Sequence, residues 1–165
     1  MATAEDGARL AWVHIRAWQQ AYAGQLPDAY LDGLMGGLDQ RVARWQEWLV
    51  SNRPLVAEAG ADGVIGFAFW GGSLDEGEAP TTAQLWAIYL LAEYWGRGVG
   101  RSLMEAAASS MREAGYQEAN LWVLDSNVRA RRFYEAAGWT ADGAAKVEDH
   151  DGVELREVRY RVRLA

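Results

Sequence analysis

The chain has 165 residues, of which 50% are hydrophobic, 12% aromatic and 24% charged, a composition that predicts a globular protein and excludes an intrinsically disordered one. It contains no cysteine, which excludes a disulfide framework, a thiol nucleophile and a cysteine-ligated metal cluster. The formal net charge of −7 opposes binding to phosphate backbones, so we expect no nucleic acid partner.

The first third of the chain is predicted to be helical. Apolar residues recur at helical spacing over residues 10–22, after Thr3, a candidate N-cap. Gly24 is expected to end this helix, and Pro27 can open the next one. A further helical segment is expected at residues 42–49, which carry two tryptophans.

The middle of the chain predicts strands and one amphipathic helix. Residues 55–59 and 64–70 form two strands joined by a short hairpin loop. Residues 85–91 are apolar on both faces, which is typical of a central strand, and residues 119–124 form a second such strand. Between these two strands, the apolar spacing over residues 99–114 predicts a helix.

The last part of the chain predicts a helix followed by a hairpin. Ser126 and Asn127 can cap a helix that runs to Gly138, which stands where a C′ glycine would. Apolar and basic residues alternate over residues 153–164, as in a half-buried strand. Because no repeat or long linker divides the chain, we expect one domain over residues 1–165 with an α/β fold.

A Gly-rich turn, Trp95-Gly96-Arg97-Gly98-Val99-Gly100-Arg101, lies between a predicted strand and a predicted helix. Backbone N–H groups in such a turn and at a helix N-terminus can bind a phosphate. Arg101 stands where the dinucleotide-binding fingerprint needs its third glycine, and the chain has no Gly-Lys pair for a P-loop, so both motifs are disfavoured. The alternative is a plain tight turn that lets strand and helix pack closely.

A second candidate feature lies on the helix after residue 126. Asn127 and Tyr134 are seven residues apart, or two helical turns, so an amide and a phenol are expected on one helix face. The alternative is structural: Asn127 caps the helix, and Tyr134 is a half-buried core aromatic.

Together the two segments resemble the GNAT superfamily of acyl-CoA-dependent N-acetyltransferases. The turn is similar to the family's pyrophosphate motif, which has Gln or Arg, two variable residues, Gly, one variable residue, and then either Gly or Ala. Residues 121–139 are similar to a second family motif, which contains Asn, then Phe-Tyr, then Gly followed by an aromatic residue. Trp95 departs from the Gln or Arg of the first motif. Residues 11–34 resemble the N-terminal helices of many bacterial members.

The resemblance implies a mixed, centrally splayed sheet of about six to seven strands flanked by about four helices, with the family's first strand truncated or missing. It implies transfer of an acetyl group from acetyl-CoA to a primary amine of a small molecule or peptide, by direct attack. The residues expected to bind the cofactor are Ile88, Tyr89, Leu90, Gly96, Arg97, Gly98, Val99, Gly100, Arg101, Asn127 and Tyr134.

Within that set, the resemblance implies distinct roles. Backbone groups of Ile88 to Leu90 would pair with the pantetheine arm, and a backbone N–H such as that of Leu90 would stabilise the oxyanion. Amides of Arg97 to Arg101 would hold the pyrophosphate. Tyr134 would be the catalytic residue that protonates the departing CoA thiolate.

The general base and the acceptor pocket are not assigned by the sequence. Acidic or imidazole side chains near the expected site are Asp75, Glu76, Glu78, Asp125, Glu148, Asp149, His150 and Asp151, each of which has a more ordinary role as a loop or capping residue. Aromatic candidates for the acceptor pocket are Trp18, Tyr22 and Trp70, with Trp86 and Tyr89 as further ones, although tryptophans mostly fill cores. His14 is expected in the core rather than in catalysis.

Two other functions stay open: a catalytically silent CoA-binding or regulatory domain, and a different α/β enzyme that uses the turn for another phosphate ligand. Two histidines make a poor metal site, so no metal is expected. No run approaches 18 apolar residues and no signal peptide pattern opens the sequence, so we expect a cytoplasmic protein without a membrane partner. A homodimer is left open.

Overall fold

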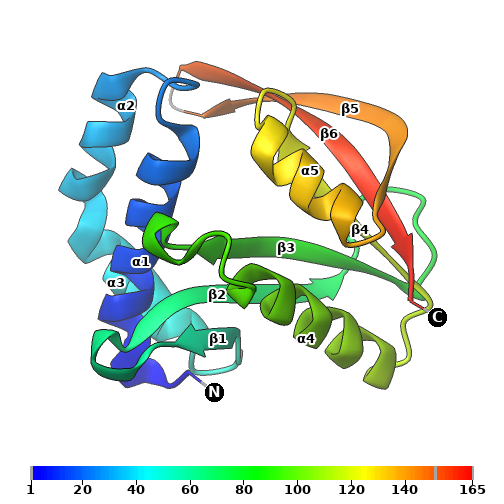
Figure 1. The fold of residues 1–165 in the computed structure, drawn as a ribbon, viewed down its shortest axis with the longest axis horizontal. Helices are drawn as coiled ribbons and strands as arrows, with labels where there is room; N and C mark the ends of the chain where they lie inside the picture. Colours follow the sequence, from blue (N-terminus) through cyan, green and yellow to red (C-terminus); the bar gives the residue numbers. More distant parts are fainter. Residues whose placement is uncertain (1, 151, 165) are drawn as a thin grey trace. The chain divides into compact units, whose positions relative to one another are not determined.

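The computed structural model describes residues 2–150 and 152–164. Within these residues the chain forms six strands and five α-helices (Figure 1). The helices are α1 (Gly7–Tyr22), α2 (Asp28–Gly33), α3 (Leu38–Trp48), α4 (Val99–Glu113) and α5 (Val128–Ala136). The strands are β1 (Leu55–Glu58), β2 (Val64–Gly72), β3 (Thr82–Leu90), β4 (Glu118–Leu124), β5 (Thr140–His150) and β6 (Val153–Arg163). They form one mixed sheet in the order β1-β2-β3-β4-β6-β5, which confirms the predicted α/β fold.

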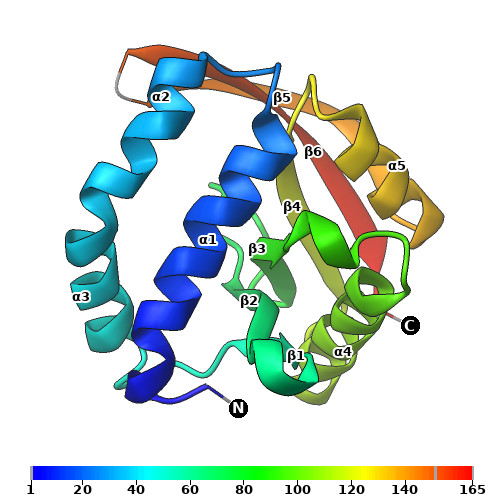
Figure 2. The same cartoon turned by 60° about the vertical axis from the view of Figure 1, so that its left-hand side comes forward.

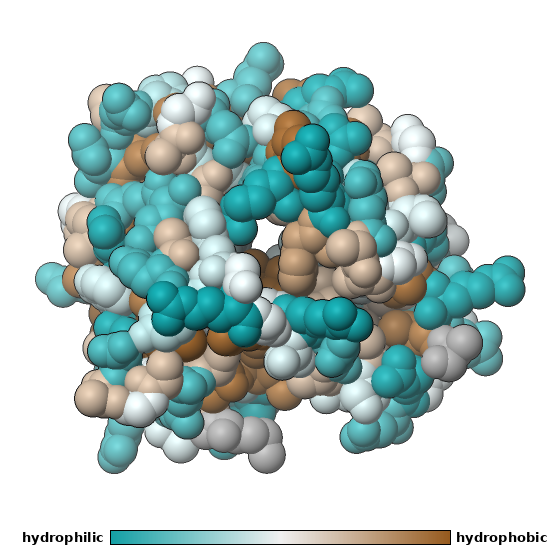
Figure 3. Space-filling model, in the orientation of Figure 1, coloured by the Kyte–Doolittle hydropathy of each residue, from teal (hydrophilic) through white to brown (hydrophobic). Residues whose placement is uncertain are grey.

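The chain divides into two compact units. The first unit contains the residues up to Phe69 together with Ala87–Ala106, and the second contains Trp70–Trp86 together with the residues from Ala107 onward. Strand β3 and helix α4 each begin in one unit and end in the other. The face seen in Figure 3 is mostly hydrophilic, with smaller hydrophobic areas between the polar side chains.

In the first unit, α1 and α3 lie side by side (Figure 2), and β1 pairs antiparallel with β2. The predicted hairpin is confirmed, with a 3-10 turn at Gly60–Asp62 connecting its strands. The buried core of this unit comes from α1, α3 and β2 and includes Leu10, Val13, Trp45 and Phe67. The helical periodicity of the first third of the sequence therefore arises from burial of one face of each helix.

The start of α1 differs from the prediction. A 3-10 turn at Ala4–Asp6 precedes the helix, which begins at Gly7. The Asp6 carboxylate accepts hydrogen bonds from the backbone N–H of Thr3 at 2.7 Å and from its hydroxyl at 3.2 Å. Thr3 is thus the donor in this pair and does not cap α1. Among residues 2–6, no strand precedes the helix.

In the second unit, β6 pairs antiparallel with both β4 and β5, and the first residues of β3 pair parallel with β4. Helix α5 lies along β5 and β6 (Figures 1 and 2). Tyr160 of β6 is 0% exposed, and its hydroxyl donates to Glu135 at 2.7 Å and accepts from Arg131 at 3.1 Å, both on α5. These bonds satisfy a buried phenol and fix α5 on the strand.

His14 of α1 lies in an aromatic cluster of the first unit. Its ring centroid is 6.1 Å from that of Trp45, 5.6 Å from that of Phe67 and 4.9 Å from that of Tyr89. Burial, assisted by the positive charge of Arg41, lowers the pKa of His14 to about 3. The ring is therefore neutral in the folded protein at neutral pH.

This pKa shift predicts a loss of stability in acid. Because unfolded His14 binds a proton below its usual pKa of about 6.5 while folded His14 does not, its contribution is fully present above that pH and is lost as the pH falls toward 3. When the pH is lowered from about 7 to about 4.5, protonation of His14 in the unfolded state should reduce the free energy of unfolding by about 2–3 kcal/mol. Urea denaturation of the wild type and of His14→Phe, at both pH values, measures this difference. An equal acid-induced loss in the two proteins would contradict the buried neutral histidine.

Candidate functional site

The Gly-rich turn ends in an open helix N-terminus. Gly96 and Gly98 have φ angles of +71° and +84°, which L side chains rarely adopt, and a Cβ at either would meet no atom within 4 Å. Ser102 N–H donates to Gly98 O at 3.0 Å as the first bond of α4. The backbone N–H groups of Val99 to Arg101 come before this bond, so they have no acceptor within the helix. The backbone here leaves both donors and space for an anion.

Trp95 ties this turn to the end of β3. Its indole Nε1–H donates to the carbonyl oxygen of Leu90 at 2.9 Å, and its backbone N–H donates to Ala92 O at 3.0 Å. This single side chain holds the Gly-rich turn next to the residues expected to pair with pantetheine. Trp95, which stands where the family motif has Gln or Arg, thus has a structural role.

The end of β3 is held closely against β2. Leu91 N–H donates to Ile65 O at 3.0 Å, and a Cβ on Gly66 would lie 2.7 Å from Tyr89 O. A larger residue at position 66 would push the strands apart, so glycine is required there. The close pairing fixes the backbone of Ile88 to Leu90.

On its other side, β3 pairs with β4 over three positions: Thr82 with Glu118, Ala83 with Ala119 and Gln84 with Asn120. The two central strands expected from the sequence are thus parallel neighbours in the sheet. The ladder lies at the N-terminal ends of both strands, and Leu85–Leu90 lie outside it.

The aromatic acceptor candidates do not form one group. In the first unit, Trp18 Nε1–H donates to the Tyr89 hydroxyl at 2.7 Å, and the Trp18 and Tyr22 ring centroids are 4.8 Å apart. In the second unit, Trp70 packs edge-on against Tyr116 at 5.9 Å. The structure therefore joins Trp18 and Tyr22 to β3 through Tyr89 and gives Trp70 a different neighbour.

Asn127 and Tyr134 lie in the second unit, and both are buried, at 4% and 9% exposure. Asn127 Oδ1 accepts from Ala130 N–H at 3.0 Å, so the asparagine caps α5 as the structural alternative predicted. Its Nδ2 forms no hydrogen bond with the residues that the structure describes, so a donor remains. The Tyr134 ring contacts those of Phe133, Trp139 and Tyr160.

The carboxylates considered as bases are engaged in ion pairs. Asp125 pairs with Arg131 at 2.7 Å and with Arg156 at 3.3 Å. Asp75 accepts from the Trp122 indole at 2.9 Å and from Arg159 at 2.9 Å. These partners favour a structural role for both side chains, so the general base stays unassigned.

The other candidates for the general base give no better assignment. Glu78 also pairs with arginines, with Arg159 at 3.0 Å and with Arg161. Asp151 and the side chain of His150 lie outside the described residues.

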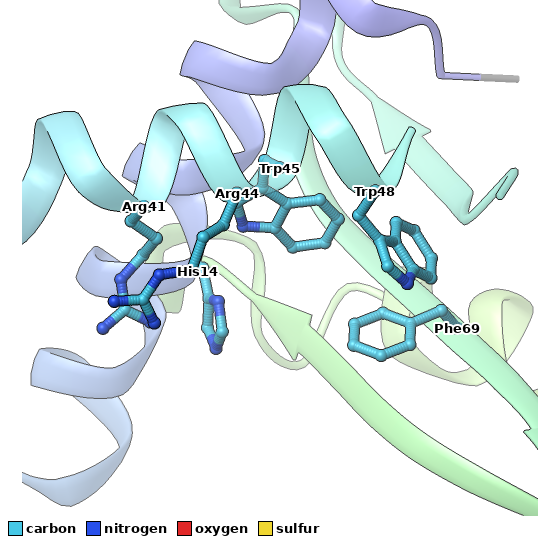
Figure 4. A pocket seen from close by; sticks show the side chains of 6 residues that line it. All are labelled: His14, Arg41, Arg44, Trp45, Trp48 and Phe69. Carbon is cyan, nitrogen blue, oxygen red and sulfur yellow. The ribbon is translucent and has the colours of Figure 1, made fainter. Parts of the chain in front are cut away.

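A pocket in the first unit was not anticipated. It has a volume of about 260 Å³ and is lined by His14, Arg41, Arg44, Trp45, Trp48 and Phe69 (Figure 4). Four of these residues lie on α3 at spacings of three and four, which places them on one helix face. That spacing is visible in the sequence, but neither Arg41 nor Arg44 is among the candidate site residues expected from the sequence.

Of the helices that the structure describes, none has both the length and the apolar content needed to span a bilayer. Within the same residues, no cluster of three or more His, Asp or Glu side chains could hold a metal ion.

Known proteins resemble this chain over most of its length. The model of the acetyltransferase (GNAT) family matches residues 11–139. The uncharacterized N-acetyltransferase YuaI of Bacillus subtilis is 31% identical over 157 residues, which are 93% of this chain and 86% of the relative. The probable N-acetyltransferase Rv2775 of Mycobacterium tuberculosis is 27% identical over 168 residues, which are 95% and 88% of the two chains.

Solved structures agree with these relatives. The PaiA N-acetyltransferase of Thermoplasma acidophilum, solved in complex with coenzyme A, superposes with a TM-score of 0.64 and 25% identity over 98% of this chain and 95% of its own. The fold, the matched motifs and the relatives identify an acetyl-CoA-dependent acetyltransferase. The chain therefore belongs to the acetyltransferase (GNAT) family.

Proposed function

We propose that the protein transfers an acetyl group from acetyl-CoA to a primary amine of a small molecule or a peptide. The observation that carries this proposal is the turn at Gly96 and Gly98, which is open on the outside and leads directly into a helix of 15 residues. The N-terminus of such a helix carries partial positive charge and backbone N–H groups that have no acceptor within the helix. It can therefore bind a pyrophosphate.

In this proposal, the first unit holds most of the cofactor. Backbone amides of Arg97 to Arg101 bind the pyrophosphate, and backbone groups of Ile88 to Leu90 pair with pantetheine. Support comes from the Trp95 bond to Leu90 O, which fixes both backbone segments relative to each other. In the second unit, Asn127 has a further side-chain donor, Nδ2, beside the Oδ1 that the helix cap uses.

Acetyl-CoA supplies a thioester carbonyl, on which the neutral amine forms a C–N bond while the C–S bond breaks and the sulfur leaves as a thiolate. The backbone N–H of Leu90 stabilises the negative charge on the carbonyl oxygen. The Tyr134 hydroxyl gives its proton to the thiolate, which a phenol can do because the two groups have comparable proton affinities. The amine loses its proton to a base that is not assigned.

Substitution at Gly98 tests the phosphate assignment. Gly98→Val places a branched side chain in the space proposed for the pyrophosphate and should raise the Kd of acetyl-CoA at least tenfold, or about 1.4 kcal/mol, in calorimetry. Gly115→Val is the matched control, because Gly115 also has a positive φ, of +91°, and open space around its Cβ position. Both variants share the backbone strain, so only the proposed binding role separates them. Equal affinities in the two variants would overturn the assignment.

Substitution at Tyr134 separates an enzyme from a silent CoA-binding domain. Tyr134→Phe keeps the ring contacts and removes the proton donor, so kcat should fall by about 10²–10⁴ while the Kd of acetyl-CoA stays unchanged. Tyr116→Phe, which removes a hydroxyl elsewhere in the second unit, should retain full turnover. Release of free CoA thiol with an accepted amine measures both. Full activity of Tyr134→Phe would refute the general acid, and binding without turnover of any amine would favour the silent domain.

A further inference from the structure

The pocket of the first unit combines an aromatic lining with two cations. Trp45 and Trp48 of α3 and Phe69 of β2 form the apolar part, and the Trp48 and Phe69 ring centroids are 5.0 Å apart. Arg41 and Arg44 extend from α3 toward the side where His14 lies (Figure 4). The six lining residues include no carboxylate. The volume of about 260 Å³ is just below the usual range of roughly 300–1,000 Å³ for ligand pockets, so it fits a small molecule or a single residue.

The two arginines lack the anionic partner that such groups usually have. In the part of the chain that the structure describes, neither Arg41 nor Arg44 forms an ion pair. Burial, together with the charge of Arg44, lowers the pKa of Arg41, while Tyr30 and Tyr89 oppose this shift. Bringing an anion between the two guanidinium groups would relieve their mutual repulsion.

Two buried polar atoms of the same pocket are also without partners. Nε of Arg41 and Nδ1 of His14 are both inaccessible to solvent and form no hydrogen bond with the described residues. Buried polar atoms are nearly always hydrogen-bonded, because each one left without a partner costs about 1–3 kcal/mol. Both atoms belong to side chains that line this one small pocket.

The pocket is connected to the strand end that carries the proposed acetyl site. The His14 ring contacts the Tyr89 ring at 4.9 Å, and Tyr89 lies between Ile88 and Leu90 on β3. All the residues in this connection belong to the first unit. A molecule bound against Arg41 and His14 therefore lies one ring away from the backbone proposed to hold pantetheine.

We propose that this pocket binds the carboxylate of the acceptor, and that the acceptor is an amino acid or a similar small amine with an apolar side chain and a carboxylate. Arg41 and Arg44 bind the carboxylate, and the tryptophans with Phe69 contact the apolar side chain. This assignment rests on the proposed acetyl transfer to a primary amine, whose acceptor it defines.

Direct binding tests the pocket without any catalysis. Phenylpropanoate carries the carboxylate and an aromatic group but no amine, so it can bind and cannot be acetylated. Calorimetry should show saturable binding to the wild type, a Kd at least tenfold higher for Arg41→Gln and Arg44→Gln, and no change for Arg112→Gln, an exposed arginine of α4. No binding, or equal binding by all four proteins, would overturn the proposal.

Acetyl transfer tests the acceptor class. The ratio of kcat/KM for phenylalanine to that for phenylalaninamide should favour the acid in the wild type and fall at least tenfold in Arg44→Gln. A ratio that the substitution leaves unchanged would overturn the acceptor assignment.

The Kd of acetyl-CoA, measured in the same proteins, separates this result from the proposed function. Arg41→Gln and Arg44→Gln should bind acetyl-CoA as the wild type does. If the wild type itself does not bind acetyl-CoA, the proposed function is refuted.

Discussion

The short parallel ladder between β3 and β4 is the constraint on which the proposed cofactor site depends. Pairing covers Thr82–Gln84 against Glu118–Asn120, while β4 continues its pairing with β6 along its whole length. The end of β3 is instead held from the other side, by the bond from Leu91 to Ile65 and the close approach at Gly66. In the proposed mode of cofactor binding, the residues of β3 beyond this ladder pair with the amide groups of pantetheine.

Asn120 and Trp122 hold β4 in this position through polar bonds rather than apolar packing alone. The Asn120 amide donates to Ser73 at 2.9 Å and, with Trp122, to the Asp75 carboxylate, which also pairs with Arg159 of β6. Asp142 joins the same network; burial opposes its ionisation, but hydrogen bonds from Ala144, Arg161 and Arg159 lower its pKa. Asp75 and Glu78 of the loop before β3 thus fix the sheet, which explains why neither is a ready general base.

The sequence predicted the order of elements because each depends on local patterns: helical spacing in the first third, alternation over residues 153–164, and a cap at Asn127 that the structure confirms. It could not predict the bond from Trp95 to Leu90, since an indole in place of Gln or Arg gives no sign of its acceptor. The pocket was missed for a related reason: His14 and Arg41 meet only after α1 packs on α3. Arginines between apolar helix positions look solvated until a neighbouring helix covers them.

Charge is distributed very differently from what the net value of −7 suggests. In the second unit, Asp75, Glu78, Asp125 and Asp142 are each bound to arginines of α5 or β6, so their negative charge is largely neutralised where it arises. Among the described residues of the first unit, Arg41 and Arg44 have no such partners, and they share one pocket with a neutral histidine. An acidic chain would be expected to select cationic acceptors, but Coulomb interactions at contact distance outweigh a screened net charge. The local excess of positive charge therefore favours an acceptor that carries a carboxylate beside its amine.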